Sequence, residues 1–501
     1  MAYDVVPPDP AGTIESLGAL GYTLESAIAD LVDNSIDADA HAVNINFHWS
    51  GPNSYITVAD DGHGMTEAEL QTAMAIAARG PRTYRSAAEL GRFGMGLKTA
   101  SFSQASRLSV WTRPLESEQP TVRVWDLEHV VNAGEWQLLH QADDAGEKIL
   151  AHESTHLSGP GTVVLWQRLS KLVDELAELD DEDSHRQFLE AVARVEAHLA
   201  MTFGRFLPGG RHTGARPLQI RINGAEVKAW DPFLQWHGST LTRPIERLQV
   251  EGQAVTLQPF VLPPKRRLTN EEYQLAAGPH GWLEQQGFYV YRNNRLIVAG
   301  DWLGLPGFRN DEKHILARIA IEIPSTLDHA WSVDVKKATA HPPITLRGSL
   351  RRTAKATRAE AQRVLSSIGK TVAHEKADDL SFVWRPERNG GDLRLRINWD
   401  HPLVKQALQA SPDARPTVRA LLRFMEETVP LPALRILFDQ EEDRDYEPFS
   451  KAPTDEIISI AERMYGAYVS QGLTPQQAII RLQHTPPFNE YPDLLSALHL
   501  I

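Results

Sequence analysis

The sequence predicts an α+β protein of two or three domains, and three observations carry this prediction. Apolar residues recur at helical spacing over 23–38, while the segments 43–47 and 56–58 alternate apolar and polar residues as strands do. From about residue 375 the chain becomes acidic and helical. A length of 501 residues exceeds the roughly 250–300 at which single cores stop growing.

The first domain is expected over residues 1–208. Its first helix has Thr23 as a candidate N-cap, and further strands are expected over 107–112, 121–127 and 162–168. A long helix follows an acidic stretch and ends near Gly209-Gly210, where we place the boundary. The apolar face of this helix is formed by Phe188, Val192, Val195, Leu199 and Phe203.

A second α+β domain is expected over 209–374, and a mostly helical one over 375–501. Strand patterns occur at 218–222 before Asn223-Gly224, at 288–291 before Asn293-Asn294, and at 315–323. In the third domain, Thr474, Pro475 and Gln477 predict a capping-box start to a short helix.

The composition limits the partners of the chain. Its formal charge is −14, from 51 basic and 65 acidic residues, which argues against coating nucleic acid or anionic membrane through an overall field. Any contact with DNA must use local basic patches. The chain has no cysteine, no signal-peptide pattern and no run of 18 uncharged apolar residues, so we expect a cytoplasmic protein without a membrane partner.

Three segments of the first domain combine polar side chains with glycines. Asp30, Asn34 and Asp37 are spaced to line one stripe of the first helix, opposite its apolar face. A strand then ends in Asp60-Asp61-Gly62-His63-Gly64-Met65, where glycines permit close backbone approach and a carboxylate can accept a hydrogen bond from an amine. The third segment, 91–99, is a glycine-rich loop that enters a helix, a pattern suited to phosphate.

In order and spacing, these segments resemble the N-box, the G1 box and the G2 box of the gyrase, heat-shock-chaperone, histidine-kinase and MutL (GHKL) superfamily. Gly159-Pro160-Gly161-Thr162-Val163 resembles its later Gly-Thr motif. The resemblance implies a Bergerat-type ATP-binding α/β sandwich that uses ATP and Mg²⁺. It implies that Asn34 coordinates Mg²⁺ and that Asp60 binds the adenine amino group. Gly62 and Gly64 would shape the base pocket with Met65 as a packing residue, Thr162 would support it, and the phosphates would lie on Gly91, Gly94, Gly96 and Lys98.

One residue departs from the superfamily pattern. ATP-hydrolysing members have a glutamate four residues before the Mg²⁺ asparagine, and this chain has Asp30 there. Either Asp30 activates the attacking water as general base from an adjusted position, or it polarises water poorly and turnover is slow.

Residues 218–345 resemble the transducer domain that follows the ATPase domain in MutL, gyrase B and Microrchidia (MORC) proteins. In those families a lysine senses ATP, and the resemblance implies that Lys337, or alternatively Lys336, reaches the terminal phosphate. Both lysines could instead be surface charges at a strand end. The segment 287–297 is most similar to MORC-like prokaryotic ATPases, which implies a connection with phage defence.

Two basic clusters stand out in the acidic chain and could contact the DNA backbone or form solvated faces. They are Lys265, Arg266 and Arg267, and the helical run Arg347, Arg351, Arg352, Lys355, Arg358 and Arg363.

The leading hypothesis is therefore an Mg²⁺-dependent ATPase that forms a homodimeric clamp on DNA and works with an effector protein, a nuclease or a helicase. A nucleotide-gated scaffold without appreciable hydrolysis and a heat-shock-type chaperone are the alternatives. A MutL endonuclease is disfavoured because residues 375–501 contain no carboxylate-rich metal motif, and a histidine kinase because the N-box begins near residue 25.

Overall fold

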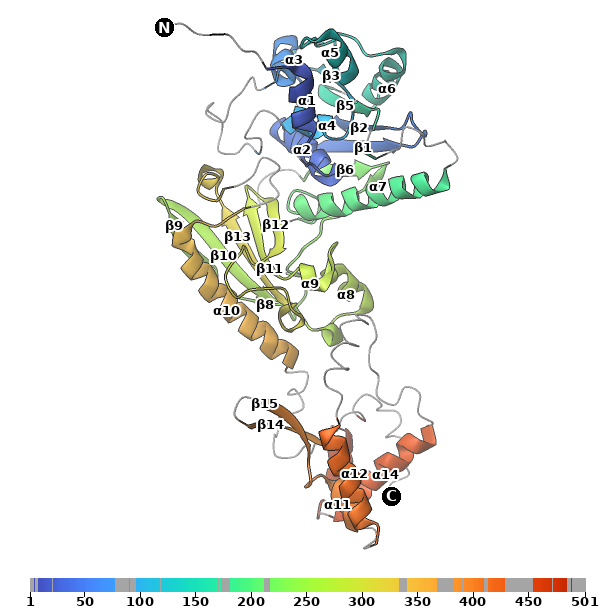
Figure 1. Cartoon of the computed structure of the whole chain (residues 1–501), viewed down its shortest axis with the longest axis vertical. Helices are drawn as coiled ribbons and strands as arrows, with labels where there is room; N and C mark the ends of the chain where they lie inside the picture. Colours follow the sequence, from blue (N-terminus) through green and yellow to red (C-terminus); the bar gives the residue numbers. More distant parts are fainter. Residues whose placement is uncertain are drawn as a thin grey trace. The chain divides into compact units, whose positions relative to one another are not determined.

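The computed structural model describes most of the chain and divides into two compact units, residues 1–365 and 366–501. Both units contain helices and strands, which confirms the predicted α+β class (Figure 1). The described residues are 4, 8–19, 21–76, 90, 96–117, 119–157, 159–169, 171–172, 181–210, 217–332, 340–366, 383–389, 392–409, 413–428, 454–470, 472–483 and 488.

The first unit begins with a sheet of order β4-β3-β5-β2-β1-β6-β7. Its strand pairs are antiparallel, except that β6 runs parallel to β1. The strands are β1 (Ala42–His48), β2 (Tyr55–Asp60), β3 (Arg107–Arg113), β4 (Thr121–Asp126), β5 (Gly161–Gln167), β6 (Gln219–Ile222) and β7 (Ala225–Glu226). Since β6 and β7 follow residue 208, the first sheet extends past the point where we placed the first boundary. The division into three domains stays a prediction.

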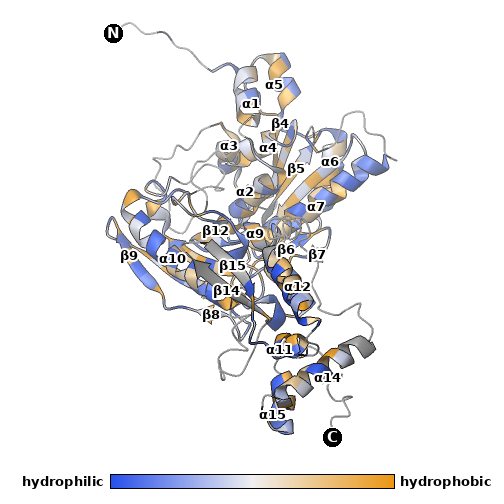
Figure 2. Cartoon of the chain, turned by 60° about the horizontal axis from the view of Figure 1, so that its bottom comes forward, coloured by the Kyte–Doolittle hydropathy of each residue, from blue (hydrophilic) through white to orange (hydrophobic). Residues whose placement is uncertain are grey.

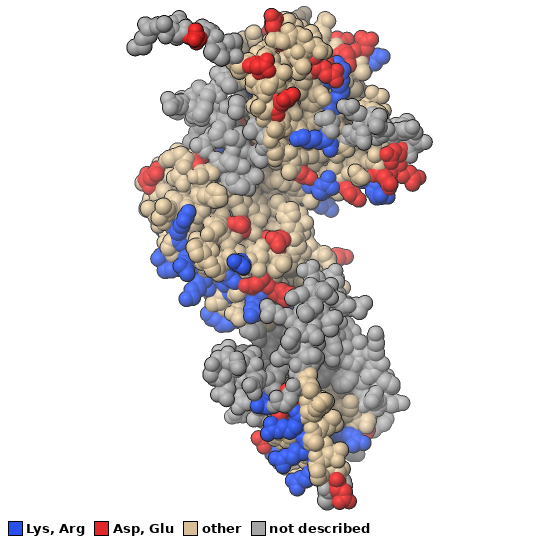
Figure 3. Space-filling model, in the orientation of Figure 1, with Lys and Arg blue, Asp and Glu red and all other residues tan. Residues whose placement is uncertain are grey.

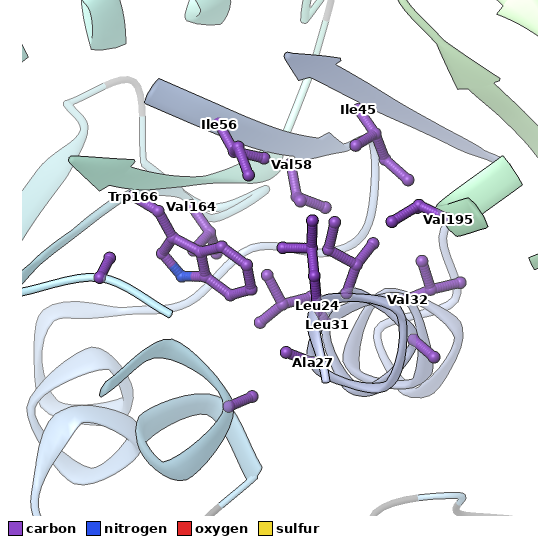
Figure 4. Packing of buried hydrophobic residues seen from close by; sticks show 14 of the residues in the cluster. Leu24, Ala27, Leu31, Val32, Ile45, Ile56, Val58, Val164, Trp166 and Val195 are labelled. Carbon is purple, nitrogen blue, oxygen red and sulfur yellow. The ribbon is translucent and has the colours of Figure 1, made fainter. Parts of the chain in front are cut away.

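Helices cover both faces of this sheet. One face and the helices α2, α4 and α7 share a core, and α6 packs on the opposite face. Figure 4 shows the apolar side of α2, including Leu24 and Leu31, turned toward Ile45, Ile56 and Val58 of β1 and β2. The helices are α1 (Pro10–Gly18), α2 (Leu24–Asp37), α3 (Glu67–Met74), α4 (Gly96–Phe102), α5 (Leu127–Ala133), α6 (Asp144–Ser154) and α7 (Glu182–Thr202). Helix α7 ends seven residues before Gly209, earlier than predicted.

A second sheet in the same unit has the order β12-β11-β13-β10-β8, with β9 paired to β10. Alternate residues of β11 serve opposite faces: Phe288 and Val290 join the core with α10, whereas Tyr289 and Tyr291 pack with Met201 of α7. The strands are β8 (Leu241–Thr242), β9 (Glu246–Val250), β10 (Gln253–Val261), β11 (Gly287–Arg292), β12 (Arg295–Asp301) and β13 (Ala317–Ile323). The helices are α8 (Asn270–Ala277), α9 (Gly281–Glu284) and α10 (Ile344–Ser366), with 3₁₀ turns at Lys265–Arg267, Glu312–His314 and Ser325–Leu327.

The second unit contains a hairpin as well as the predicted helices. Its described elements are β14 (Trp384–Asn389), β15 (Asp392–Ile397), α11 (Pro402–Gln409), α12 (Arg415–Glu427), α14 (Thr454–Ser470) and α15 (Pro475–Gln483). The predicted capping box is present, since Thr474 N donates to Gln477 Oε1 at 3.0 Å and Gln477 N to Thr474 Oγ1 at 3.4 Å. Among the described helices of the chain, none has both the length and the apolar character that a membrane span requires.

Candidate nucleotide site

Helix α2 supplies the first polar residues of the site. A capping box fixes its start, because Thr23 N donates to Ser26 Oγ at 3.0 Å and Ser26 N donates to Thr23 Oγ1 at 3.3 Å. With the apolar face packed on the sheet, the predicted polar stripe lies on the other side of the helix. Asp30 is buried there, and Asn34, one turn later, is exposed.

The carboxylate of Asp30 is held between Tyr22 and the start of α4. Tyr22 Oη donates to Asp30 Oδ2 at 2.9 Å. A Cβ on Gly96, the first residue of α4, would lie 3.4 Å from the same oxygen. The backbone that leaves the glycine-rich segment therefore passes directly beside the predicted general base.

Asp60, at the end of β2, forms a second polar centre. Ser35 Oγ donates to Asp60 Oδ2 and Gly62 N donates to Oδ1, both at 3.0 Å. Burial raises the pKa of Asp60 to about 6, although both hydrogen bonds favour the carboxylate. Near neutral pH Asp60 is an ionised acceptor with few water contacts, which suits the recognition of an amine.

The backbone after Asp60 leaves no room for side chains at the two predicted glycines. A Cβ on Gly62 would lie 2.8 Å from Ala38 O, and one on Gly64 would lie 2.1 Å from Arg113 O. Gly64 also has a φ of +67°, which L side chains rarely adopt. The structure thus explains both glycines by close backbone approach.

Thr162 lies opposite Asp60 in the β2–β5 register, and its support of the base pocket stays a prediction. Its hydroxyl is 3.2 Å from Thr112 Oγ1, and Thr112 accepts a hydrogen bond from Met65 N at 2.9 Å. Thr112 therefore joins β3, β5 and the Met65 loop. It was missed from the sequence, where it is one polar residue inside a strand pattern.

Lys98 lies at the start of α4 and is buried. Its Nζ donates to Ala73 O of α3 at 2.7 Å, and burial lowers its pKa to about 8. The bond to Ala73 uses one of the three donors of the ammonium group, and the phosphate role of Lys98 stays a prediction. Gly91, Gly94, Lys336 and Lys337 lie outside the described residues.

The second sheet adds two arginines that the sequence did not single out as site residues. Arg295 Nε donates to Asp33 Oδ1 at 2.8 Å, and Arg295 Nη2 lies 3.9 Å from Asp30 Oδ1. Arg292 Nη1 donates to the carbonyl of Leu90 at 3.1 Å, immediately before the glycine-rich loop. The only sequence signal was that both residues flank the predicted Asn293-Asn294 turn.

A metal at this site would be held by oxygen ligands. Asn34 presents an exposed carboxamide one turn from Asp30, a donor type that Mg²⁺ accepts together with phosphate oxygens. The residues present therefore fit Mg²⁺ with a nucleotide. The described part of the chain contains no group of three or more His, Cys, Asp or Glu side chains placed to hold a metal by themselves.

Comparison with known proteins gives one family and several relatives. Residues 22–156 match the family described as histidine kinase-, DNA gyrase B- and HSP90-like ATPase. ATPase morc-1 of Caenorhabditis elegans is 35% identical over 88 residues, which are 18% of this chain and 10% of that protein. The DNA mismatch repair protein MutL of Shewanella amazonensis is 36% identical over 124 residues, 24% of this chain and 18% of that protein. The MutL of Acidiphilium cryptum is 34% identical over 110 residues, 21% of this chain and 18% of that protein.

These matches cover less than a fifth of the length of each relative. The family match includes Asp30, Asn34, Asp60 and the glycines beside them. Residues 22–156 are therefore a GHKL-type ATPase region, in a chain related to MORC and MutL proteins.

Proposed function

We propose that this chain binds ATP with Mg²⁺ and hydrolyses it, with Asp30 as the general base. One observation carries the proposal: a buried carboxylate lies beside Gly96 at the start of α4 and one turn from the exposed Asn34. This observation supports a base, a metal ligand and a phosphate-binding backbone on two adjoining helices.

The base of the nucleotide would lie against Asp60. The carboxylate accepts a hydrogen bond from the exocyclic amine of adenine, which guanine lacks at that position. Gly62 and Gly64 let the backbone after Asp60 pack against Ala38 O and Arg113 O, where a Cβ would collide, and this backbone would shape the base pocket. Asp60 thus provides base selectivity as well as affinity.

Hydrolysis requires a base near the terminal phosphate. Asp30 takes the proton of the attacking water as general base, while the Tyr22 hydroxyl holds the carboxyl group in place. Asn34 would hold Mg²⁺, which supplies neutralisation of phosphate charge when it is bound. The shorter aspartate is compatible with this role because the backbone of Gly96 approaches it so closely.

The metal ligand is tested through the Mg²⁺ requirement of turnover. Asn34→Ala raises the Mg²⁺ concentration at half-maximal ATP turnover by roughly tenfold or more, while nucleotide binding in EDTA stays unchanged. Asn53→Ala, at another exposed asparagine, is the matched control. An unchanged Mg²⁺ requirement in Asn34→Ala would remove this residue from the metal site.

ATP binding is further proposed to close a homodimer. The support is the relation to MORC and MutL proteins, together with the resemblance that makes Lys336 or Lys337 a phosphate sensor. Solution mass with a non-hydrolysable ATP analogue would double on this account. A monomer at all concentrations with the analogue bound would rule the clamp out.

DNA is the proposed partner of the dimer, together with a nuclease or helicase effector in DNA processing or phage defence.

The surface proposed to contact DNA is helix α10. This helix has both hydrophilic and hydrophobic residues, and basic side chains gather along its surface (Figures 2 and 3). Its exposed cations are Arg347, Arg351, Arg352, Lys355 and Arg363. Arg358 is different: it pairs with Asp311 at 2.6 Å and lies over the rings of Trp302 and Phe308, so it is a packing residue.

The DNA contact is tested by charge reversal on α10. Arg351→Glu with Lys355→Glu weakens duplex binding and reduces its salt dependence, since each phosphate contact contributes about one counterion to the salt slope. Lys148→Glu with Arg186→Glu, at exposed positions of α6 and α7, makes the same change in charge as a control. Equal DNA binding by the two double variants would exclude α10 as the contact.

A nucleotide-gated scaffold is the alternative function, and the aspartate at position 30 favours it to the extent that the shorter side chain polarises water poorly. Such a scaffold would bind ATP and close without turning it over. Turnover and binding measured on the same sample separate the two functions.

A further inference from the structure

The β11–β12 hairpin ends in a buried pair of arginines. Its two-residue turn, Asn293-Asn294, has φ values of +47° and +67°, the combination that matches the twist of paired strands. Arg292 and Arg295 face each other across the ladder directly below this turn. They are only 4% and 2% exposed, so each guanidinium needs partners of opposite charge nearby.

Arg295 finds its partners on α2. Its Nε donates to Asp33 Oδ1 at 2.8 Å, and its Nη2 lies 3.9 Å from Asp30 Oδ1. Asp33 is completely buried. The proposed general base, Asp30, lies three residues before it on the same helix. A shift of Arg295 would therefore displace the helix turn that carries Asp30.

Arg292 acts on the other side of the same site. Its Nε donates to both carboxylate oxygens of Asp328, at 2.8 and 2.9 Å, which fixes the guanidinium within the second sheet region. Its Nη1 donates to Leu90 O, and Leu90 N in turn donates to Asp37 Oδ1 of α2 at 2.7 Å. The residue before the glycine-rich loop is thus held between the hairpin and α2.

We infer that this hairpin tip positions the hydrolytic half of the site, so that turnover depends on the docking of the second sheet onto α2. The inference rests on the proposed ATPase function. Arg292 and Arg295 are positioning residues, because they act through Asp33, Asp30 and Leu90. Adenine recognition uses Asp60 with Ser35 and Gly62, none of which these arginines contact in the described structure.

The hairpin contact differs from phosphate sensing by a lysine. Its acceptors are carboxylates and a carbonyl of the protein itself, so it needs no phosphate to form. It therefore makes hydrolysis sensitive to anything that moves the second sheet, whether or not the nucleotide pocket changes.

The experiment compares kcat with the dissociation constant of ATP in variants of the full chain. Arg295→Met alone would remove the cation that pairs with the buried Asp33 carboxylate, so the main variant combines Arg295→Met with Asp33→Asn. Arg295→Lys retains a cation at the position without the planar fork. Arg318→Lys, a buried arginine of the same sheet that bonds to Tyr289 and to the carbonyl of Ala276, is the control for general weakening of the sheet.

The expected result is a separation of kcat from binding. In the double variant kcat falls by about 100-fold, as a misplacement of about 1 Å can cause, while ATP affinity changes by less than about threefold. Arg295→Lys recovers part of kcat, and Arg318→Lys leaves both quantities near wild type.

Three outcomes would overturn the inference. If the folded double variant keeps the wild-type kcat, the hairpin does not position the base. If kcat and affinity fall together, and do so equally in Arg318→Lys, the arginine only stabilises the sheet. If the wild-type chain binds ATP without turning it over, the proposed ATPase function fails first, and the inference fails with it.

Discussion

Arg295 Nε and Asp33 Oδ1 lie 2.8 Å apart, although 262 residues separate them in the sequence. Both side chains are buried, one at the start of β12 and the other inside α2. The pair joins the second sheet to the helix that carries Asp30 and Asn34. The nucleotide site is therefore built from the first sheet region but braced from the second.

Asp60 is predicted to determine both affinity and base selectivity. Asp60→Asn replaces an acceptor-only carboxylate by an amide and removes a hydrogen bond to a charged group, which lowers ATP affinity by roughly 10- to 100-fold. Preference for ATP over GTP should fall in parallel, as measured by titration calorimetry. Asp61→Asn is the matched control. Unlike Asp60, Asp61 accepts hydrogen bonds through Oδ1 from the backbone N–H groups of His41 and Ala42, at the start of β1. Equal affinities for the two variants would exclude Asp60 as the adenine ligand.

ATP binding is also predicted to weaken in mild acid. Burial raises the pKa of Asp60 from 3.8 to about 6, so the carboxylate that accepts the adenine amine is lost as the pH falls through 6. ATP affinity measured from pH 7.5 to 5 should decline in the wild type and stay low and constant in Asp60→Asn. A wild-type affinity that is constant over this range would contradict the assignment.

The raised pKa of Asp60 also predicts how the free energy of unfolding changes with pH. Between about pH 4 and 6 the folded chain retains a proton on Asp60 that the unfolded chain has lost, so stability falls as the pH rises through this window. The cost of the ionised group at pH 7 is about 3 kcal/mol. Asp60→Asn removes it, and urea unfolding at pH 4 and pH 7 should show the variant gaining stability relative to wild type only at the higher pH.

His198 is predicted to change the free energy of unfolding with pH in the direction opposite to Asp60. Burial, with Arg295 nearby, lowers the pKa of His198 from 6.5 to about 4. The contribution of the neutral imidazole to the free energy of unfolding is therefore complete above pH 6.5 and is lost as the pH falls toward 4. Relative to His198→Gln, the wild type should lose about 2 kcal/mol between pH 7 and 5. The pH dependences that Asp60 and His198 give to the free energy of unfolding partly cancel in the wild type. Each effect is therefore seen only by comparison with its single variant.

Local signals in the sequence were sufficient for helix α2 and strands β1 to β5 of the first sheet. The helical spacing after Thr23 and the alternation in 43–47 and 56–58 reflect contacts within a few residues, and the structure has α2, β1 and β2 there. The polar stripe of α2 also follows from local helix geometry. The close approaches at Gly62 and Gly64 are different, because they involve Ala38 O and Arg113 O of other segments.

Contacts between distant segments could not be predicted in the same way. Nothing near Arg295 in the sequence indicates Asp33, and the hydroxyls of Tyr22, Ser35 and Thr112 acquire their partners only when separate strands and helices pack together. The basic run of α10 likewise appeared uniform, whereas packing turns Arg358 toward Trp302. Strand β6 was expected to begin a new domain, but its pairing with β1 depends on the tertiary fold.

Gly64 is predicted to tolerate no side chain. Gly64 and Gly134 have nearly the same φ, +67° and +66°, but a Cβ would lie 2.1 Å from Arg113 O at the first position and would meet nothing within 4 Å at the second. Gly134→Ala should cost about 1 kcal/mol from the backbone conformation alone. Gly64→Ala should cost at least about 2 kcal/mol more and reduce ATP binding, as urea unfolding and calorimetry would show. Equal costs would mean that the loop moves freely away from β3.

The central claim is that Asp30 is the base of an ATPase, and Mg²⁺-dependent ATP turnover of wild type and Asp30→Asn, with nucleotide binding measured on the same samples, tests it most directly. The account predicts turnover in the wild type and a loss of roughly 100-fold or more in Asp30→Asn, with ATP still bound. Turnover that survives in Asp30→Asn, or ATP binding by the wild type with no turnover, would contradict it.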